Sequence, residues 1–218
     1  AVPWAMLYDH QGHAPRIHPS AVVAPSAVIS GDVELGEDVQ VLHGAVITAD
    51  GGRVRVGAHT IVMENAVIRG VAGNEVTIGN HCLIGPHAYV SGATIEAEVF
   101  LATGSRVFNG AVVGRGSEVR INAIVHLKTR LPEQTTVPIG WVAVGTPPLI
   151  APPEQHDAIW VRQRELDFPE YVFGLDRDTP DLMVQLTERY GARLARHARD
   201  RPVDSAHPVQ SIEPIDSD

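Results

Sequence analysis

The chain has 218 residues with 17 basic and 26 acidic side chains, and its formal net charge is −9. Binding of nucleic-acid phosphates needs clustered Lys and Arg, so this balance argues against a nucleic-acid partner. A single cysteine, Cys82, excludes an intramolecular disulfide and is typical of a reducing compartment. Because we find no secretory leader pattern in residues 1–20 and no apolar run of about 18 residues, we expect a cytoplasmic protein without a membrane span.

After a lead-in over residues 1–16, aliphatic residues recur at every sixth position. The series runs from Ile17 and Val23 to Leu131 and Val137. A helix needs a period of 3.6 and a simple strand a period of two, so neither explains the pattern. A triangular coil explains it, because each of three short strands then points one aliphatic side chain inward. About 20 such hexads predict an all-β solenoid of about seven parallel coils over residues 17–148.

The pattern changes after residue 148, where the proline-rich segment GTPPLIAPPEQ ends the solenoid. EQHDAIWVRQRELD, residues 154–167, predicts one helix. TPDLMVQLTERYGARLARHARD, residues 179–200, predicts a second helix with Thr179 as its N-cap and Pro180 at its first position. We therefore expect a helical region over residues 149–200, followed by a disordered tail over residues 201–218 that lacks apolar spacing.

Three segments carry a resemblance to a known family. They are IHPSAVVAPSAVISGDVELGEDVQVLHGAVITAD near the start, VGAHTIVMENAVIRG in the middle and GWVAVGTPP at the end of the repeat. Residues 17–148 resemble the γ-class carbonic anhydrase-like proteins through these segments. The resemblance implies a left-handed β-helix, a hand that the spacing alone does not show. It also implies a homotrimer whose metal lies between subunits and is held by three histidines.

The three positions that carry the family's metal-binding histidines fall here on Arg69, Pro86 and Ser91. Proline has no donor atom and a guanidinium stays protonated in proteins, so neither residue binds zinc. We therefore expect no metal at the inherited site and no zinc-dependent hydration of carbon dioxide. Two further interface positions of the family also differ, being Thr48 and Met63 in this chain.

Assigning the hexads to three faces in turn places His43, Glu64 and Pro86 in one column. Thr48, Arg69, Ser91 and His126 share a column on the next face. In the family these two columns come from adjacent subunits and meet at the interface. The resemblance thus implies a mixed pocket with His43, Glu64 and His87 from one chain and Thr48, Arg69 and Ser91 from the other.

Several functions fit this pocket. The first hypothesis is a metal-free, cofactor-free homologue that binds or transforms a small anion between subunits. Arg69 would hold the anion beside Glu64, Ser91, Thr48 and Met63, while His43 or His87 would transfer a proton. This first hypothesis is favoured and it leans towards an enzyme, although the sequence alone leaves catalysis open.

Three alternatives remain open. The second hypothesis is a hexapeptide acyltransferase that uses acyl-coenzyme A, with His126 as the base. The third is a non-catalytic trimeric scaffold whose helices recruit a partner. A relocated metal site of His43, Glu64 and His87 is a further alternative. Arg69 and Glu64 could also pair with each other across the subunit interface.

Overall fold

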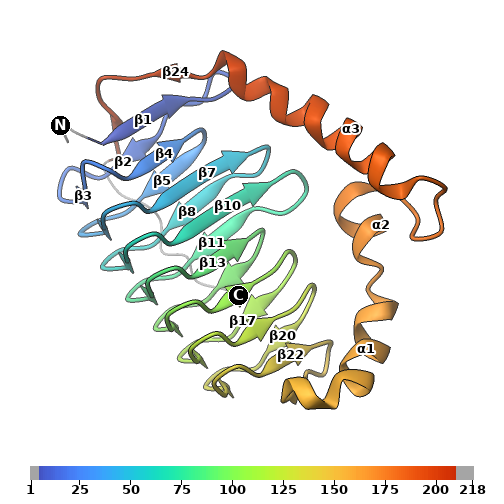
Figure 1. Ribbon diagram of the computed structural model, residues 1–218. Helices are drawn as coiled ribbons and strands as arrows, with labels where there is room; N and C mark the ends of the chain where they lie inside the picture. Colours follow the sequence, from blue (N-terminus) through green and yellow to red (C-terminus); the bar gives the residue numbers. More distant parts are fainter. Residues whose placement is uncertain (1–4, 210–218) are drawn as a thin grey trace.

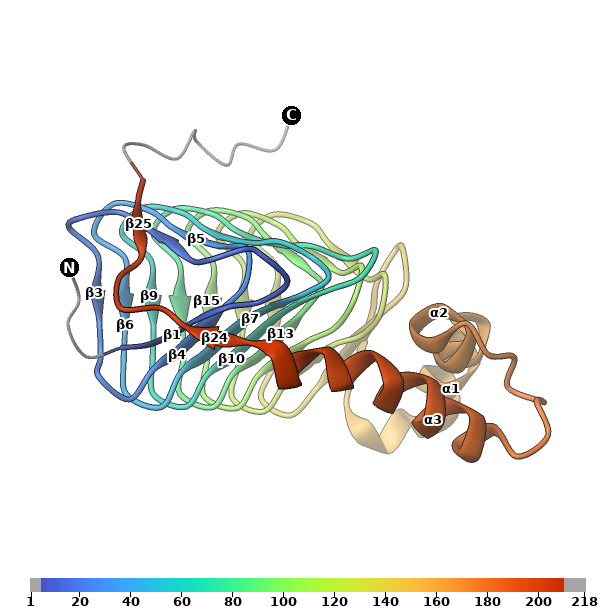
Figure 2. The same ribbon diagram turned by 90° about the horizontal axis from the view of Figure 1, so that it is seen from above.

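The computed structural model of the protein describes residues 5–209. Its centre is a triangular prism of three parallel sheets, stacked coil on coil along the prism axis (Figures 1 and 2). Within the described residues the chain completes seven coils, and a further strand, β22, begins the next coil. The solenoid is a left-handed parallel β-helix, so the predicted fold and the number of coils are confirmed.

Each sheet takes one strand from every coil. The first sheet contains β1 (Met6–Asp9), β4 (Val28–Ser30), β7 (Val46–Asp50), β10 (Val67–Val71), β13 (Tyr89–Ser91), β16 (Arg106–Val107), β19 (Ile124–Val125) and β22 (Val142–Val144), with antiparallel β24 (Arg201–Pro202) and β23 (Leu149–Ala151) at its two ends. The second sheet contains β2 (Arg16–Ile17), β5 (Val33–Leu35), β8 (Val54–Val56), β11 (Val76–Ile78), β14 (Thr94–Ile95), β17 (Val112–Val113), β20 (Arg130–Leu131) and, at its end, β25 (His207–Pro208). The third sheet contains β3 (Val22–Val23), β6 (Gln40–Val41), β9 (Ile61–Val62), β12 (Leu83–Ile84), β15 (Phe100–Leu101), β18 (Glu118–Val119) and β21 (Thr136–Val137).

The hexad repeat sets the register of these strands. Ile47 lies between Ile29 and Ile68 in neighbouring coils, and all three side chains are fully buried inside the prism. Stacking the aliphatic side chains of neighbouring coils on one another removes one such side chain from water at every sixth position. Each buried side chain stabilises the fold by about 1.5–3 kcal/mol. The six-residue period is interrupted twice, because Val56 lies nine positions after Ile47 and Ile78 lies ten positions after Ile68. These interruptions follow the buried residues of β7 and β10, which at five residues each are the longest strands of their sheet.

The C-terminal region runs back along the outside of the prism. It contains η1 (Pro153–Gln155), α1 (His156–Glu165), α2 (Phe168–Phe173), α3 (Leu182–Leu194) and η2 (Ala195–Arg199). Figure 1 shows α1 beside the last coils and the end of α3 beside the first coils, and Figure 2 shows all three helices beside one corner of the prism. The helix predicted over residues 154–167 is confirmed as α1. No helix in residues 5–209 combines the length and the apolar character needed to cross a membrane.

Two expectations about the C-terminal region were wrong. Asp181, and not Thr179, precedes α3, because Thr179 belongs to a turn in which its amide donates to the carbonyl oxygen of Asp176. The segment from residue 201, expected to be disordered, is ordered up to residue 209. There β24 pairs with β1, and β25 pairs with β2, so the chain covers sheet edges left open by the first coil. The rest of that predicted tail, residues 210–218, lies outside the described residues.

Candidate functional site

A column of polar side chains follows the end of the first sheet. In β7, β10 and β13, Thr48 lies opposite Arg69, and Arg69 lies opposite Ser91. Each residue follows a buried aliphatic residue of the repeat, so its side chain points out of the prism by strand alternation. The stacking of Thr48, Arg69 and Ser91 predicted from the hexads is therefore confirmed.

Arg69 is held by its own chain. Its Nη2 donates to the hydroxyl of Tyr190 on α3 at 2.9 Å and lies 3.6 Å from Oδ2 of Asp50 at the end of β7. Arg193 on α3 donates to the carbonyl oxygen of Asp50 at 2.8 Å, and its Nη2 lies 3.5 Å from the same Oδ2. The Asp50 side chain is 5% exposed, whereas both arginine side chains are 27% exposed. A buried carboxylate thus lies between two partly hydrated cations.

A pocket of about 280 Å³ opens beside this charge cluster, between the solenoid and helices α2 and α3. Its polar lining comes from Arg69, Arg193, Ser91, Asn74 and Asn109. Its walls are mainly aromatic and comprise Tyr89, Phe108, Phe168, Tyr171, Phe173 and Tyr190. The Tyr171 hydroxyl donates to Oδ1 of Asn74 at 2.7 Å, which ties α2 to the loop after β10. A cationic end and flat apolar walls suit a small anion that carries an apolar part.

Comparison with known proteins shows which proteins the chain is similar to. No family model matches it. Over 125 residues it is 33% identical to γ carbonic anhydrase 1, mitochondrial, of Arabidopsis thaliana, a match covering 55% of this chain and 46% of that protein. Over 118 residues it is 31% identical to carnitine operon protein CaiE of Escherichia coli K12, covering 54% of this chain and 60% of that protein. Over about half of its length the chain is thus similar to γ-carbonic anhydrase and CaiE proteins.

This γ-carbonic anhydrase-like chain spans about half the length of the curated relatives that it matches. Its fold is also similar to that of a hexapeptide transferase family protein from Anaplasma phagocytophilum, with a TM-score of 0.49 and 19% sequence identity. That similarity covers 89% of this chain and 98% of the other.

Arg69, Pro86 and Ser91, where the resemblance places the family's metal ligands, do not fit a zinc ion. Arg69 and Ser91 lie side by side in the sheet, and the Arg69 guanidinium points its donors at Tyr190 and Asp50. A guanidinium has no lone pair to offer a metal, and Pro86 offers no side-chain donor. Zinc chemistry at this column is therefore not supported by its donor set.

The remaining residues of the predicted mixed pocket lie at another corner of the prism. The register of β6, β9 and β12 carries His43, Glu64 and Pro86 into one line, as predicted. His43, Glu64 and His87 are exposed, Met63 is half-buried, and His43 Nδ1 is 2.8 Å from the hydroxyl oxygen of Ser26. Within one chain this corner does not join the Arg69 pocket.

His126 follows β19 on the column of Thr48, Arg69 and Ser91, as predicted. Its ring lies 6.2 Å from that of Phe108, a residue of the pocket wall, and its Nδ1 has no hydrogen-bond partner among the described residues. Burial lowers the pKa of His126 below its ordinary value of 6.5. The imidazole is therefore neutral at pH 7 and can accept a proton.

Sequence reasoning missed the residues that α3 contributes. Tyr190 and Arg193 touch the column from more than 100 positions away in the chain. Their spacing on the helix carries no motif, and only the return of α3 along the prism brings them to Asp50 and Arg69. Asp50 itself could be found, because the resemblance preserves an acidic residue at its position.

Proposed function

We propose that this γ-carbonic anhydrase-like protein is a homotrimer that lacks the family's zinc site and binds a small carboxylate at Arg69, close to the subunit interface. The observation that carries the proposal is the charge at the pocket. Two guanidinium groups there face one carboxylate, Asp50, at 3.5–3.6 Å, which exceeds hydrogen-bond length. Arg69 Nη2 donates to Tyr190 and Arg193 Nη2 to the Asp50 carbonyl oxygen, but a guanidinium carries five N–H donors, so each arginine keeps further donors for a second anion.

A carboxylate is the anion that this geometry favours. A guanidinium presents parallel N–H donors that match the two oxygens of a carboxylate, and such paired hydrogen bonds are stronger than neutral ones. The pocket volume of about 280 Å³ is small for a ligand site, which restricts the ligand to a few carbon atoms or one ring. Phe108, Tyr171 and Phe173 would contact the apolar part of that ligand.

Chemistry on such a ligand would need a proton-transfer group. His43 and His87 are exposed at a corner of the prism and are available to an adjacent copy of the chain in the trimer that the resemblance implies. In that arrangement Glu64 and Met63 would border the pocket of the neighbouring chain, beside Thr48 and Ser91. The pocket would then bind its ligand with Arg69, and an imidazole of the neighbouring chain would serve as its proton-transfer group.

The experiment is a thermal-shift and calorimetric titration with a panel of small aliphatic and aromatic carboxylates, each paired with its neutral amide. We expect carboxylates to bind and amides not to bind. Arg69→Met should remove the stabilisation, whereas Arg130→Met, at an exposed arginine of β20 on another sheet, should leave it unchanged. Equal stabilisation of the wild type and Arg69→Met by a carboxylate would contradict the proposal.

A second candidate is acyl transfer from acyl-coenzyme A, which the neutral, half-buried His126 favours. A base must hold its lone pair free at neutral pH, and burial without a partner on Nδ1 achieves this. The test is acyl-coenzyme A turnover with a panel of amine and alcohol acceptors. Turnover that is lost in His126→Gln and retained in Arg69→Met would favour this candidate over carboxylate binding.

A further inference from the structure

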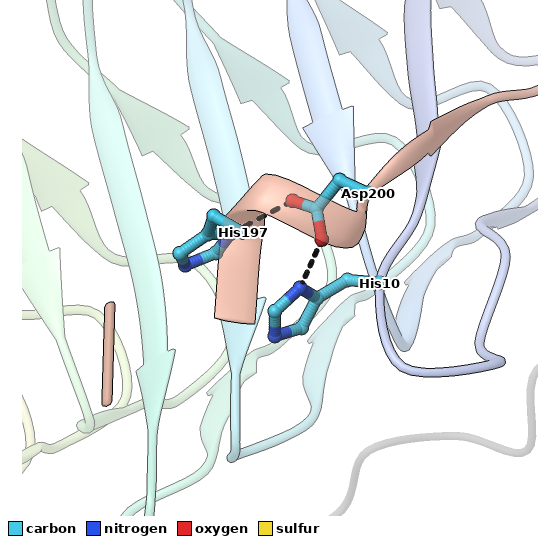
Figure 3. Close-up of side chains that lie close together, drawn as sticks. All are labelled: His10, His197 and Asp200. Atoms are coloured by element: carbon cyan, nitrogen blue, oxygen red, sulfur yellow. Dashed lines mark hydrogen bonds and ion pairs between the residues drawn. The ribbon is translucent and has the colours of Figure 1, made fainter. Parts of the chain in front are cut away.

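Three potential metal ligands converge where the C-terminal region meets the first coil (Figure 3). His10 follows β1, His197 lies in η2, and Asp200 lies between η2 and β24. His10 and Asp200 are 190 positions apart in the sequence. The two imidazole rings stack with centroids 4.3 Å apart, and both turn their Nδ1 atoms towards the Asp200 carboxylate in Figure 3.

The donor atoms are close enough to share one ion. His10 Nδ1 lies 2.5 Å from Asp200 Oδ1, and His197 Nδ1 lies 2.8 Å from Asp200 Oδ2. One donor atom from each of the three residues lies within 4.8 Å of the other two. Ligands of a zinc ion sit about 2.0–2.2 Å from the metal and hence about 3–3.5 Å from one another. A zinc ion would replace the protons shared between each histidine Nδ1 and the Asp200 carboxylate. To admit it, each nitrogen would need to move away from the carboxylate oxygen by only a few tenths of an ångström to about 1 Å.

The outer nitrogen of each imidazole also has a polar neighbour. His10 Nε2 lies 3.0 Å from the side-chain amide of Gln11, and His197 Nε2 lies 3.8 Å from Oδ1 of Asp50. Histidines that bind metals usually donate their second ring N–H to a carboxylate or an amide oxygen, which fixes the tautomer with the lone pair on the binding nitrogen. Asp50, and Gln11 with its amide oxygen turned inward, can both supply that contact.

We propose that His10, His197 and Asp200 form a binding site for a divalent transition-metal ion of the zinc class. Two imidazole nitrogens and one carboxylate oxygen suit Zn²⁺, Co²⁺ or Ni²⁺, whereas Mg²⁺ and Ca²⁺ prefer oxygen ligands alone. The site differs from the family's position at Arg69, Pro86 and Ser91. Its histidines come from the two ends of the described chain.

The three side chains differ in their exposure to solvent. The His10 side chain is 3% exposed, whereas those of Asp200 and His197 are 15% and 35% exposed. An ion can thus enter from the side of η2, and three protein ligands leave a further coordination position to water.

The bound ion would tie η2, and with it the end of α3, to the first coil. Since Tyr190 and Arg193 on α3 form one wall of the Arg69 pocket, metal binding would also fix that wall. This consequence does not depend on which ligand the pocket takes, because the ion acts on the position of the helix.

The test uses the full chain, dialysed against a chelator and then titrated with Zn²⁺ by calorimetry, with Mg²⁺ as the control ion. Co²⁺ adds a visible absorption band that reports the ligand set. We expect one ion for each chain, a higher melting temperature with Zn²⁺, and no effect of Mg²⁺. Asp200→Asn should weaken Zn²⁺ binding by at least tenfold, and His13→Ala, an exposed histidine in the same turn, should not weaken it.

Should Asp200→Asn fail to fold, Gln11→Ala provides a second test. Gln11→Ala removes only an outer contact from an exposed residue and should weaken Zn²⁺ binding by roughly 10-fold, within the range of about 10–100-fold for outer partners. Absence of stoichiometric binding to the wild type would overturn the proposal, and the cluster would then be a purely hydrogen-bonded contact. Binding that is unchanged in both Asp200→Asn and Gln11→Ala would overturn it equally.

Discussion

Asp50 offers a test of how charge holds α3 against the solenoid. Its carboxylate is 5% exposed and lies near the cations of Arg69 and Arg193, which are 27% exposed. Asp50→Asn leaves two arginines that can regain water, so each lost ion pair should cost about 0–1 kcal/mol, as at a surface. We therefore expect Asp50→Asn to lower the free energy of unfolding by at most about 2 kcal/mol in total.

Removing the cations should cost more. In the double variant Arg69→Met and Arg193→Met, the buried carboxylate keeps no arginine partner, and loss of the partners of a buried charge costs about 3–5 kcal/mol. The lost hydrogen bond from Arg193 to the Asp50 carbonyl oxygen adds about 1 kcal/mol. Adding Asp50→Asn to that double variant removes the unpaired charge. The same substitution should therefore destabilise the wild type and stabilise the double variant.

The measurement is urea denaturation followed by far-UV circular dichroism, at one protein concentration and with a chelator present. Substitution of Arg130 by Met on the second sheet serves as the matched control and should change stability by less than about 0.5 kcal/mol. An effect of Asp50→Asn with the same sign in both backgrounds would refute the reasoning.

Four further outcomes are expected. Light scattering should give a mass of about 70 kDa, three times the 23.4 kDa of one chain, and a mass of one chain in dilute solution would contradict the proposed trimer. In Asp200→Asn, which lacks one ligand of the proposed zinc site, hydration of carbon dioxide should stay at the uncatalysed rate with or without added Zn²⁺, because the column of Arg69 and Ser91 offers no zinc ligand set; a rate that rises with Zn²⁺ in this variant would contradict the prediction. Burial raises the pKa of the Cys82 thiol to about 11, so at pH 8 it should react with a thiol reagent only after unfolding, and fast reaction of the native protein would show that it is exposed. Because burial lowers the pKa of His126 in the folded state, the unfolded state takes up a proton on this residue first as pH falls through about 6.5. The free energy of unfolding should therefore decrease below that pH, and His126→Gln should reduce the decrease. Urea denaturation at several pH values measures both effects.

The hexad repeat alone determined the solenoid, because the inward-pointing residue of each short strand is set by local spacing. Pairing equivalent positions of the repeat in adjacent coils sets the register of every coil, and the same pairing places Thr48, Arg69 and Ser91 in one line. For the same reason the line of His43, Glu64 and Pro86 was predicted correctly from the sequence. These contacts join residues one coil apart, and a periodic sequence specifies such contacts directly.

The structure of the C-terminal region depends on contacts with the solenoid rather than on a repeat in its own sequence. Its helix α1 could be predicted from composition, but the position of α3 depends on the turn at residues 174–181 and on contacts with the finished solenoid. The two-residue strands β24 and β25 have no apolar alternation, since they bond to sheet edges through the backbone, which any sequence supplies. The Arg69 pocket, completed by Tyr190 and Arg193, and the cluster of His10, His197 and Asp200 were therefore decided by tertiary structure. They form only because the chain returns to its own first coil.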